Sequence, residues 1–165
     1  MAIVTADIEY RLSGGASNSS PAASLGGVKS STVLGSDLFD DVASSESAAG
    51  DVEYRCVYVH NDHGSLTMES SKIWIQANTP SPDTVIAIGL GTSAINGTEQ
   101  TVVDESTAPS GVSFSSPSSE GTALSLGNIP FGQHKAVWVR RTVTAGASAY
   151  NSDSFTLRVK CDTAA

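Results

Sequence analysis

Apolar and polar residues alternate with a period of two along most of this chain, a pattern typical of strands with one dry and one wet face. The clearest case is residues 52–60, whose first face carries Val52, Tyr54, Cys56 and Tyr58. The second face begins with the charged residues Glu53 and Arg55 and becomes apolar at Val57 and Val59. We therefore expect a central strand whose second face is exposed to solvent at its start and buried at its end.

The same alternation predicts further short strands, separated by segments rich in Gly, Ser, Pro and Asn. They are expected at residues 8–12, 28–34, 66–78, 85–90, 112–114, 123–126, 135–143 and 154–161. The segment 66–78 directly follows the turn at 61–64, so it is predicted to be the hairpin partner of residues 52–60. About eight or nine short strands at regular spacing indicate an all-β fold, an antiparallel two-sheet sandwich of jelly-roll or immunoglobulin-like type.

Residues 36–50 are the one segment in which the pattern favours a helical turn. Ser36 or Asp37 is a candidate N-cap, and Gly50 is expected to end the turn. The side chains expected to point inward are Leu38, Phe39 and Val42. With 165 residues, the chain is predicted to be a single sandwich domain over residues 1–165, with residues 1–5 as a candidate extended arm.

The net charge of −8, without any cluster of Lys and Arg, argues against binding to nucleic acid. No window of the sequence approaches the roughly 20 apolar residues of a membrane-spanning helix, so no membrane partner is expected. The N-terminus lacks the basic start and apolar run of a signal peptide. We therefore expect a protein made in a cytoplasm.

No segment carries a motif specific for catalysis or for a cofactor. Residues 89–94 fit G-x-G-x-x-A, but a turn follows them, whereas a dinucleotide site requires a helix there. His60, Asp62 and His63 share one short turn without a third strong ligand nearby, so a solvated turn is the interpretation rather than a metal site. The acidic pairs at 40–41 and 104–105 are interpreted as surface acids. The sequence thus predicts no enzyme, no metal and no cofactor.

Four further features bear on contacts rather than on chemistry. Cys56 and Cys161 are interpreted as buried thiols, although a disulfide between them stays open. Trp74 and Trp138 fall opposite the regular aliphatic rows, and each is a candidate interface anchor if exposed. The N-terminal residues Ala2, Ile3 and Val4 form an apolar stretch that is a candidate for adding an edge strand to a neighbour.

Several phrases of the sequence resemble small structural proteins from the head-gene clusters of tailed bacteriophages. They are LFDDV at 38–42, AAGDVEYRCVYVHN at 48–61, NTPSPD at 78–83, IGLGT at 88–92, NGTEQ at 96–100 and PFGQHKAVWVRR at 130–141. Together they resemble capsid cement, or head decoration, proteins. The resemblance implies a homo-oligomeric β-sandwich, a dimer or a trimer, on the exterior of the virion capsid. Its partner would be the major capsid protein, whose neighbouring subunits it clamps, with no enzymatic activity.

Other functions remain open from the sequence. A tail or neck structural protein would share the same fold class. A carbohydrate- or host-binding module would need an exposed aromatic platform, for which the candidates are Tyr54, Tyr58, Trp74 and Trp138. A hydrolase with an unrecognised site is the third alternative.

Overall fold

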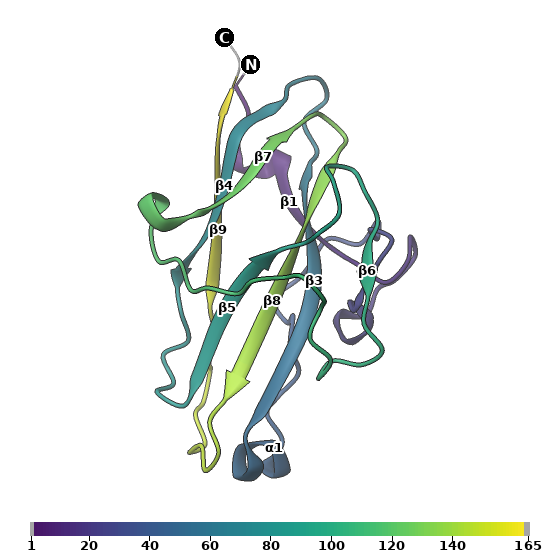
Figure 1. The fold of residues 1–165 in the computed structure, drawn as a ribbon. Coiled ribbons are helices and arrows are strands. Elements are labelled where there is room, and N and C mark those ends of the chain that lie inside the picture. Colours follow the sequence, from purple (N-terminus) through teal and green to yellow (C-terminus); the bar gives the residue numbers. More distant parts are fainter. Residues whose placement is uncertain (1, 164–165) are drawn as a thin grey trace.

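Nine antiparallel strands make up the fold in the computed structural model, which describes residues 2–163 (Figure 1). This confirms the all-β prediction. The strands are β1 (Ile8–Leu12), β2 (Gly26–Gly27), β3 (Asp51–Asn61), β4 (Met68–Ala77), β5 (Thr84–Leu90), β6 (Glu99–Thr101), β7 (Leu124–Ile129), β8 (His134–Val143) and β9 (Thr156–Thr163). The short helices are η1 (Thr5–Asp7), η2 (Pro21–Ala23), α1 (Ser44–Ala49) and η3 (Glu120–Thr122).

Two sheets form the sandwich, one with the strand order β1-β3-β8-β5 and the other with the order β7-β4-β9. A separate small pair joins β2 to β6. The chain changes directly from one of these two sheets to the other between β3 and β4, between β4 and β5, between β7 and β8, and between β8 and β9. The four-stranded order corresponds to A-B-E-D of an immunoglobulin-like sandwich, with β4 and β9 in the places of C and F. The topology thus favours the immunoglobulin-like alternative.

The main core lies between the two sheets and is built by the predicted alternation. Its fully buried members include Val57 and Val59 of β3, Val137 and Val139 of β8, and Ile73 of β4. The last strand adds a row of partly buried side chains from the other sheet, namely Phe155, Leu157, Val159 and Cys161. The alternation predicted for 135–143 and 154–161 is therefore confirmed.

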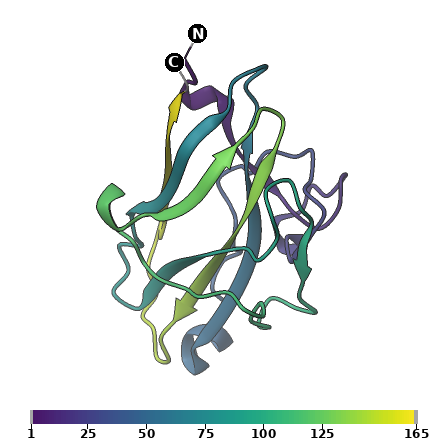
Figure 2. The ribbon, with the colours of Figure 1, turned by 45° about the horizontal axis from the view of Figure 1, so that its top comes forward.

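A second core lies on the opposite face of the four-stranded sheet, where the described residues provide only the small β2–β6 pair and loops as cover. Trp138, Tyr58, Cys56 and Ala136 are buried there beneath irregular segments that include β2 and β6. Figure 2 shows these segments beside β3, on the side away from β9. The molecule is therefore covered by strands on one face of its central sheet and by loops on the other.

Residues 66–78 are not the hairpin partner of 52–60, which corrects the sequence prediction. β4 instead pairs with β7 and β9 in the other sheet. The side chain of Asn61 fixes this corner, because its amide donates to the carbonyls of Leu66 at 2.9 Å and Ile129 at 2.8 Å. The chain therefore turns across the sandwich instead of returning along β3.

Three other local predictions are also revised. Residues 28–34 form only an isolated bridge between Arg11 and Val33, and 112–114 contain no strand. The helix begins at Ser44, later than expected, because Glu46 accepts a hydrogen bond from the Ala43 N–H at 2.6 Å. Gly50 ends it as predicted. Leu38 is buried and Phe39 packs against the core, whereas Val42 is exposed.

Candidate functional site

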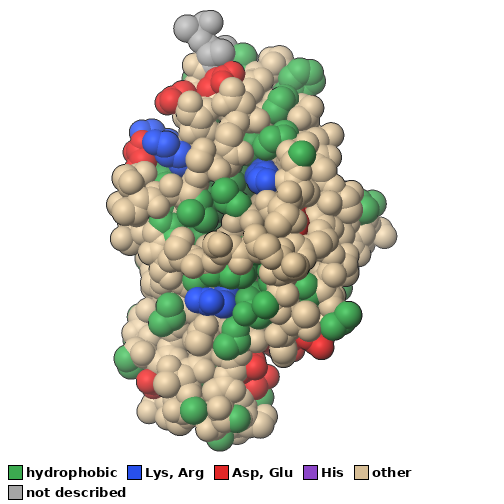
Figure 3. Space-filling view, in the orientation of Figure 1, with side chains coloured by type: hydrophobic (Ala, Val, Ile, Leu, Met, Phe, Trp, Pro, Cys, Tyr) green, Lys and Arg blue, Asp and Glu red, His purple; other side chains and the backbone are tan. Residues whose placement is uncertain are grey.

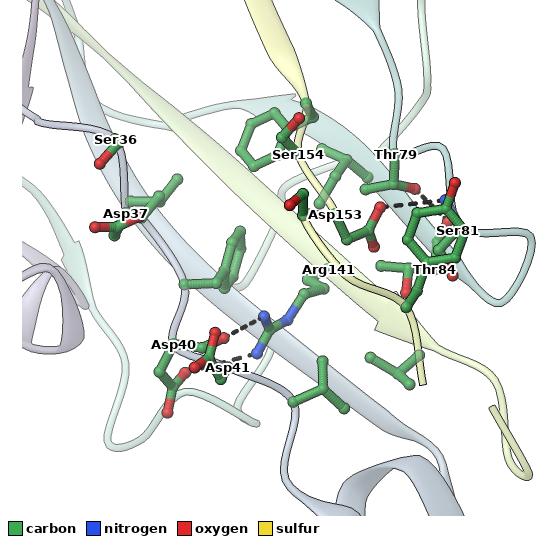
Figure 4. Close-up of a pocket in the computed structure, with 18 of the residues that line it drawn as sticks. Ser36, Asp37, Asp40, Asp41, Thr79, Ser81, Thr84, Arg141, Asp153 and Ser154 are labelled. Atoms are coloured by element: carbon green, nitrogen blue, oxygen red, sulfur yellow. Dashed lines mark hydrogen bonds and ion pairs between the residues drawn. The ribbon is translucent and has the colours of Figure 1, made fainter. Parts of the chain in front are cut away.

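A cleft of about 1030 Å³ opens on the side of the sandwich where α1 lies (Figure 4). One wall is residues 34–42, a segment that we call the strap. The remaining walls come from the start of β5, the end of β8 and residues 147–157. The strap follows β2 and leads into α1. Because it crosses the open edge of the main core, it brings charged side chains over buried strand residues.

The floor of the cleft is a buried ion pair between β8 and β3. Arg141 and Glu53 are cross-strand partners, and Arg141 Nε donates to Glu53 Oε2 at 2.5 Å. Arg141 Nη1 donates to the Asp40 carbonyl at 2.5 Å, and its Nη2 lies 3.6 Å from the Asp40 carboxylate. The strap is thereby tied to the central sheet at Asp40.

A second arginine extends this network. Arg55 is 1% exposed and donates to the carboxylate of Glu105. The Phe39 ring packs against both guanidiniums, whose central carbons lie 5.5 Å (Arg55) and 4.9 Å (Arg141) from the ring centroid. These distances fall within the range of cation–π attraction. The Phe39 ring is thus held in place by cation–π attraction as well as by apolar packing.

Three carboxylates, those of Asp40, Glu53 and Glu105, meet within 4.8 Å of one another. Burial raises the pKa of Glu53, and the two neighbouring arginines oppose that rise. A divalent cation placed here would have to displace guanidiniums that already pair with the acids. The arrangement therefore fits a structural ion-pair network, in which removing one partner leaves a buried charge.

The expectation of a wet start for the strand at 52–60 is wrong, because Glu53 and Arg55 are each 1% exposed. The surface interpretation of the acidic pairs also missed that Asp40 and Glu105 reach inward to arginines. A signal was present in the sequence. Arg55 and Arg141 occupy the face of their strands that elsewhere carries core valines, so each needed an acidic partner.

The rim of the cleft is polar, and its residues form hydrogen bonds with one another. Thr79 Oγ1 donates to the Thr84 carbonyl at 2.5 Å, and the Ser81 N–H donates to Asp153 at 3.2 Å. Figure 4 shows these residues on the wall opposite Asp40. Tyr150 adds a ring that is 49% exposed. Such a rim suits non-covalent binding through hydrogen bonds and one aromatic contact.

A second candidate surface covers the other face of the central sheet. We call residues 13–34 and 91–115 together the loop layer. Its backbone is bonded directly to β3, because Cys56 N donates to Ser24 O and Tyr54 N to Glu105 O, both at 2.7 Å. Tyr58 Oη also donates to the Gly27 carbonyl at 2.6 Å. The loop layer is therefore a fixed layer, and it leaves Val28 (50%) and Val103 (87%) exposed.

Residues 89–94 lie at the inner side of the loop layer, and a hydrogen-bonded loop follows β5 there. The Glu99 carboxylate accepts hydrogen bonds from Ser93 N at 2.8 Å and Thr92 Oγ1 at 3.0 Å. Burial alone would raise the pKa of Glu99, but these hydrogen bonds outweigh it and lower the pKa to about 2. A Cβ at Gly91 would lie 2.4 Å from Glu99 Oε2, so this glycine makes room for the carboxylate.

The histidine turn is organised differently from the sequence expectation. His60 lies beside Asp62, 3.5 Å from Nε2 to Oδ1, and Glu9 of β1 completes the group. Arg11 donates to Glu9 at 2.7 Å and approaches Asp62 at 3.4 Å. A guanidinium therefore pairs with both carboxylates that could join His60 as metal ligands.

The other two histidines have local roles. His63 Nδ1 accepts hydrogen bonds from the N–H groups of residues 65 and 66, at 3.1 and 3.0 Å, and so closes the turn. His134 begins β8 and meets the Tyr58 ring edge-on at 4.7 Å between centroids. Burial, followed by the nearby positive charge of Lys29, lowers the pKa of His134 to about 4.

Neither tryptophan is exposed in this chain, which corrects the idea of exposed anchors. Trp138 is 0% exposed in the second core, and Trp74 is 7% exposed with the Arg158 guanidinium 5.8 Å from its ring. Tyr54 and Tyr58, the other proposed platform residues, are buried as well. All four rings are buried, so they do not form a surface platform.

The N-terminal stretch is partly anchored. Ile3 packs against the main core, whereas Ala2 is exposed and Val4 is 58% exposed. Asp7 accepts a hydrogen bond from the Val4 N–H at 2.8 Å, which closes η1. Met1 and residues 164–165 lie outside the described residues. A role of Ala2–Val4 in contacts with a neighbour stays a prediction.

Both cysteines are free thiols. Cys56 is buried in the second core, as interpreted from the sequence, and burial raises its pKa. Cys161 is only partly buried, and it lies on β9 in the other sheet. The two thiols therefore belong to different cores.

Comparison of the chain with protein-family models, with curated proteins and with solved structures finds no match. Among residues 2–163, no helix is long and apolar enough to cross a membrane. The function must therefore be argued from the surfaces themselves.

Proposed function

We propose that this chain is a structural protein of a tailed-bacteriophage virion, which binds the outside of the capsid and stabilises it by clamping neighbouring capsid subunits. The observation that carries the proposal is the loop layer, whose long segments are bonded to the sheet instead of being free. A preordered surface loses little conformational entropy when it binds. The sequence phrases that resemble head decoration proteins supply the identity of the partner.

The character of the surface supports this proposal. In Figure 3, uncharged polar atoms and backbone predominate, and charged side chains are scattered among them. The buried charged residues at the floor of the cleft pair within the chain, so they serve its stability. Weak identical contacts repeated over a capsid lattice can give firm attachment through multivalency.

The first test is quantitative protein composition of purified virions. A decoration protein is expected in a copy number close to that of the major capsid protein, and mild denaturant should release it before the shell breaks. A dozen copies or fewer would move the chain to the tail or neck. Absence from the particle would overturn the proposal of a virion protein.

A second test addresses the loop layer directly. Val103→Arg places a charge at a valine that is 87% exposed, so it should weaken binding to undecorated capsids at least tenfold without unfolding the chain. Val85→Arg is the matched control, because Val85 is 49% exposed at the start of β5 and outside the loop layer. Equal binding by both variants, measured by co-sedimentation, would rule out docking through Val103.

The cleft favours one alternative, a module that binds a carbohydrate or another polar ligand. Its polar rim and the exposed Tyr150 ring are the specific observation. Binding on a glycan array that is lost in Tyr150→Ala would support this function. A glycan array without hits would count against it.

A further inference from the structure

The four outer edges of the two sheets are protected to very different degrees. On β1, residues 30–34 bond to the outer edge, with Leu34 N donating to Tyr10 O at 2.7 Å. On β5, Ile88 and Ser115 exchange two backbone hydrogen bonds of 2.8 and 3.0 Å. The third edge, β7, has six residues, and its register with β4 shifts at Gly127. These are familiar ways of protecting an edge strand from pairing.

The fourth edge, that of β9, lacks such protection. It has eight residues and pairs with β4 on one side. Among residues 2–163, no backbone hydrogen bond outside that pairing involves a residue of β9. Its two register shifts come from extra residues on β4, so β9 itself is regular. A long, regular and unpaired edge is a template for another strand.

The topology and the core both place a missing strand at this edge. In an immunoglobulin-like sandwich, strand F lies between C and G, and β9 occupies the place of F with only β4 beside it. The inward row Leu157, Val159 and Cys161 is only partly buried against the main core. One added strand would cover this row and complete the sheet.

The charges on β9 indicate which strand fits. Arg158, Lys160 and Asp162 are exposed on the outer face of the sheet. Lys160 is neutralised within the chain by Glu120, whose two oxygens lie 2.8 and 2.9 Å from Nζ. Arg158 and Asp162 have no such partner among the described ion pairs, and they carry opposite charges four residues apart. A copy of β9 in antiparallel orientation is complementary to this pattern.

We infer that β9 pairs with β9 of a second copy, antiparallel about a two-fold axis at Lys160, to form a continuous six-stranded sheet. Arg158 then lies opposite Asp162 of the second copy, twice by symmetry, and Val159 lies opposite Cys161. Lys160 lies opposite Lys160 of the second copy, and each of these two lysines is already paired with Glu120 of its own chain. Centring the pair on Val159 would place Arg158 opposite Lys160 instead of Asp162, and would lose both pairs of opposite charge. Centring it on Cys161 would reduce the overlap to residues 159–163. The Lys160 register therefore combines an overlap of residues 157–163 with two symmetry-related pairs of opposite charge, Arg158 with Asp162.

Sedimentation equilibrium of the purified chain over 1 to 100 µM tests the inference without any capsid. The chain of 16.9 kDa should reach twice that mass. Arg158→Asp should weaken the affinity of the dimer about 10- to 100-fold, because it places two acidic side chains opposite each other at each of the two symmetry-related sites. The double variant R158D/D162R should restore dimerisation by exchanging the charges. Val103→Arg, which adds a charge in the loop layer and outside β9, is the control and should leave the mass unchanged.

A monomeric wild-type chain at 100 µM would overturn the inference. Failure of the double variant to recover the dimer, with its thermal unfolding unchanged, would overturn the proposed register. This pairing goes beyond capsid decoration, so its failure would leave the decoration proposal standing.

Discussion

The two faces of the four-stranded sheet are covered in contrasting ways. On the sandwich face, valines and isoleucines of β3, β5 and β8 meet a second sheet, and the strand period decides which residues face that sheet. On the loop face, Trp138 and Tyr58 are covered by irregular segments that individual hydrogen bonds hold in place. The contrast shows that a sheet face can be covered by apolar side chains that repeat with the strand period or by irregular segments that a few specific hydrogen bonds hold in place. The two solutions should respond differently to single substitutions.

The largest effect is expected where the sandwich face carries charge. Arg141→Met should lower the free energy of unfolding by about 3 to 5 kcal/mol, because it leaves Glu53 buried without its main partner. Urea denaturation followed by circular dichroism measures this loss. The double variant E53Q/R141M should recover a substantial part of it, since the uncompensated charge is gone. A double variant as unstable as Arg141→Met would show that lost packing against Phe39, and not charge, dominates.

Much of the sandwich face was predictable from the sequence, whereas its charged end was not. The alternation at 135–143 and 154–161 identified which side chains point inward, because apolar burial follows the strand period directly. The two arginines showed that acidic partners were needed but not which ones: Asp40 depends on where the strap crosses, and Glu105 on where the loop layer crosses. Both crossings are set by tertiary contacts far apart in sequence. Local pattern therefore could not reveal it.

A smaller but more localised effect is expected on the loop face. Gly26 has φ +94°, and a Cβ there would lie 1.8 Å from the Gln100 carbonyl oxygen. Gly26→Ala should therefore separate β2 from β6 and destabilise the chain by about 2 to 3 kcal/mol. Hydrogen exchange should accelerate first in the loop layer. Gly35→Ala is the control, because nothing lies within 4 Å of its added Cβ and it should be nearly neutral.

Little of the loop layer could be predicted, and the reason is physical. Its order rests on contacts such as the Tyr58 hydroxyl donating to the Gly27 carbonyl, which join residues 31 positions apart. Composition indicated that segments rich in Gly, Ser, Pro and Asn separate the strands, but not that such segments would pack over Trp138. The β9 edge was missed for the opposite reason. The alternation marks a strand, but it does not show which neighbour the strand lacks.

The smallest effect expected is a dependence of stability on pH that resides on the loop face. His134 has a folded pKa of about 4 against an ordinary value of 6.5, so between these values the unfolded chain binds a proton that the folded chain does not. Stability should therefore fall as the pH drops from 6.5 toward 4, by about 1 to 2 kcal/mol at pH 5 from this residue. The pKa of His60 is lowered as well, chiefly through burial.

Comparing urea denaturation at pH 7 and pH 5 for the wild type and His134→Gln isolates the contribution of His134. An equal loss in both proteins would move the acid sensitivity to other groups, whereas a smaller loss in His134→Gln would place the first acid-sensitive contact where the loop layer meets β8.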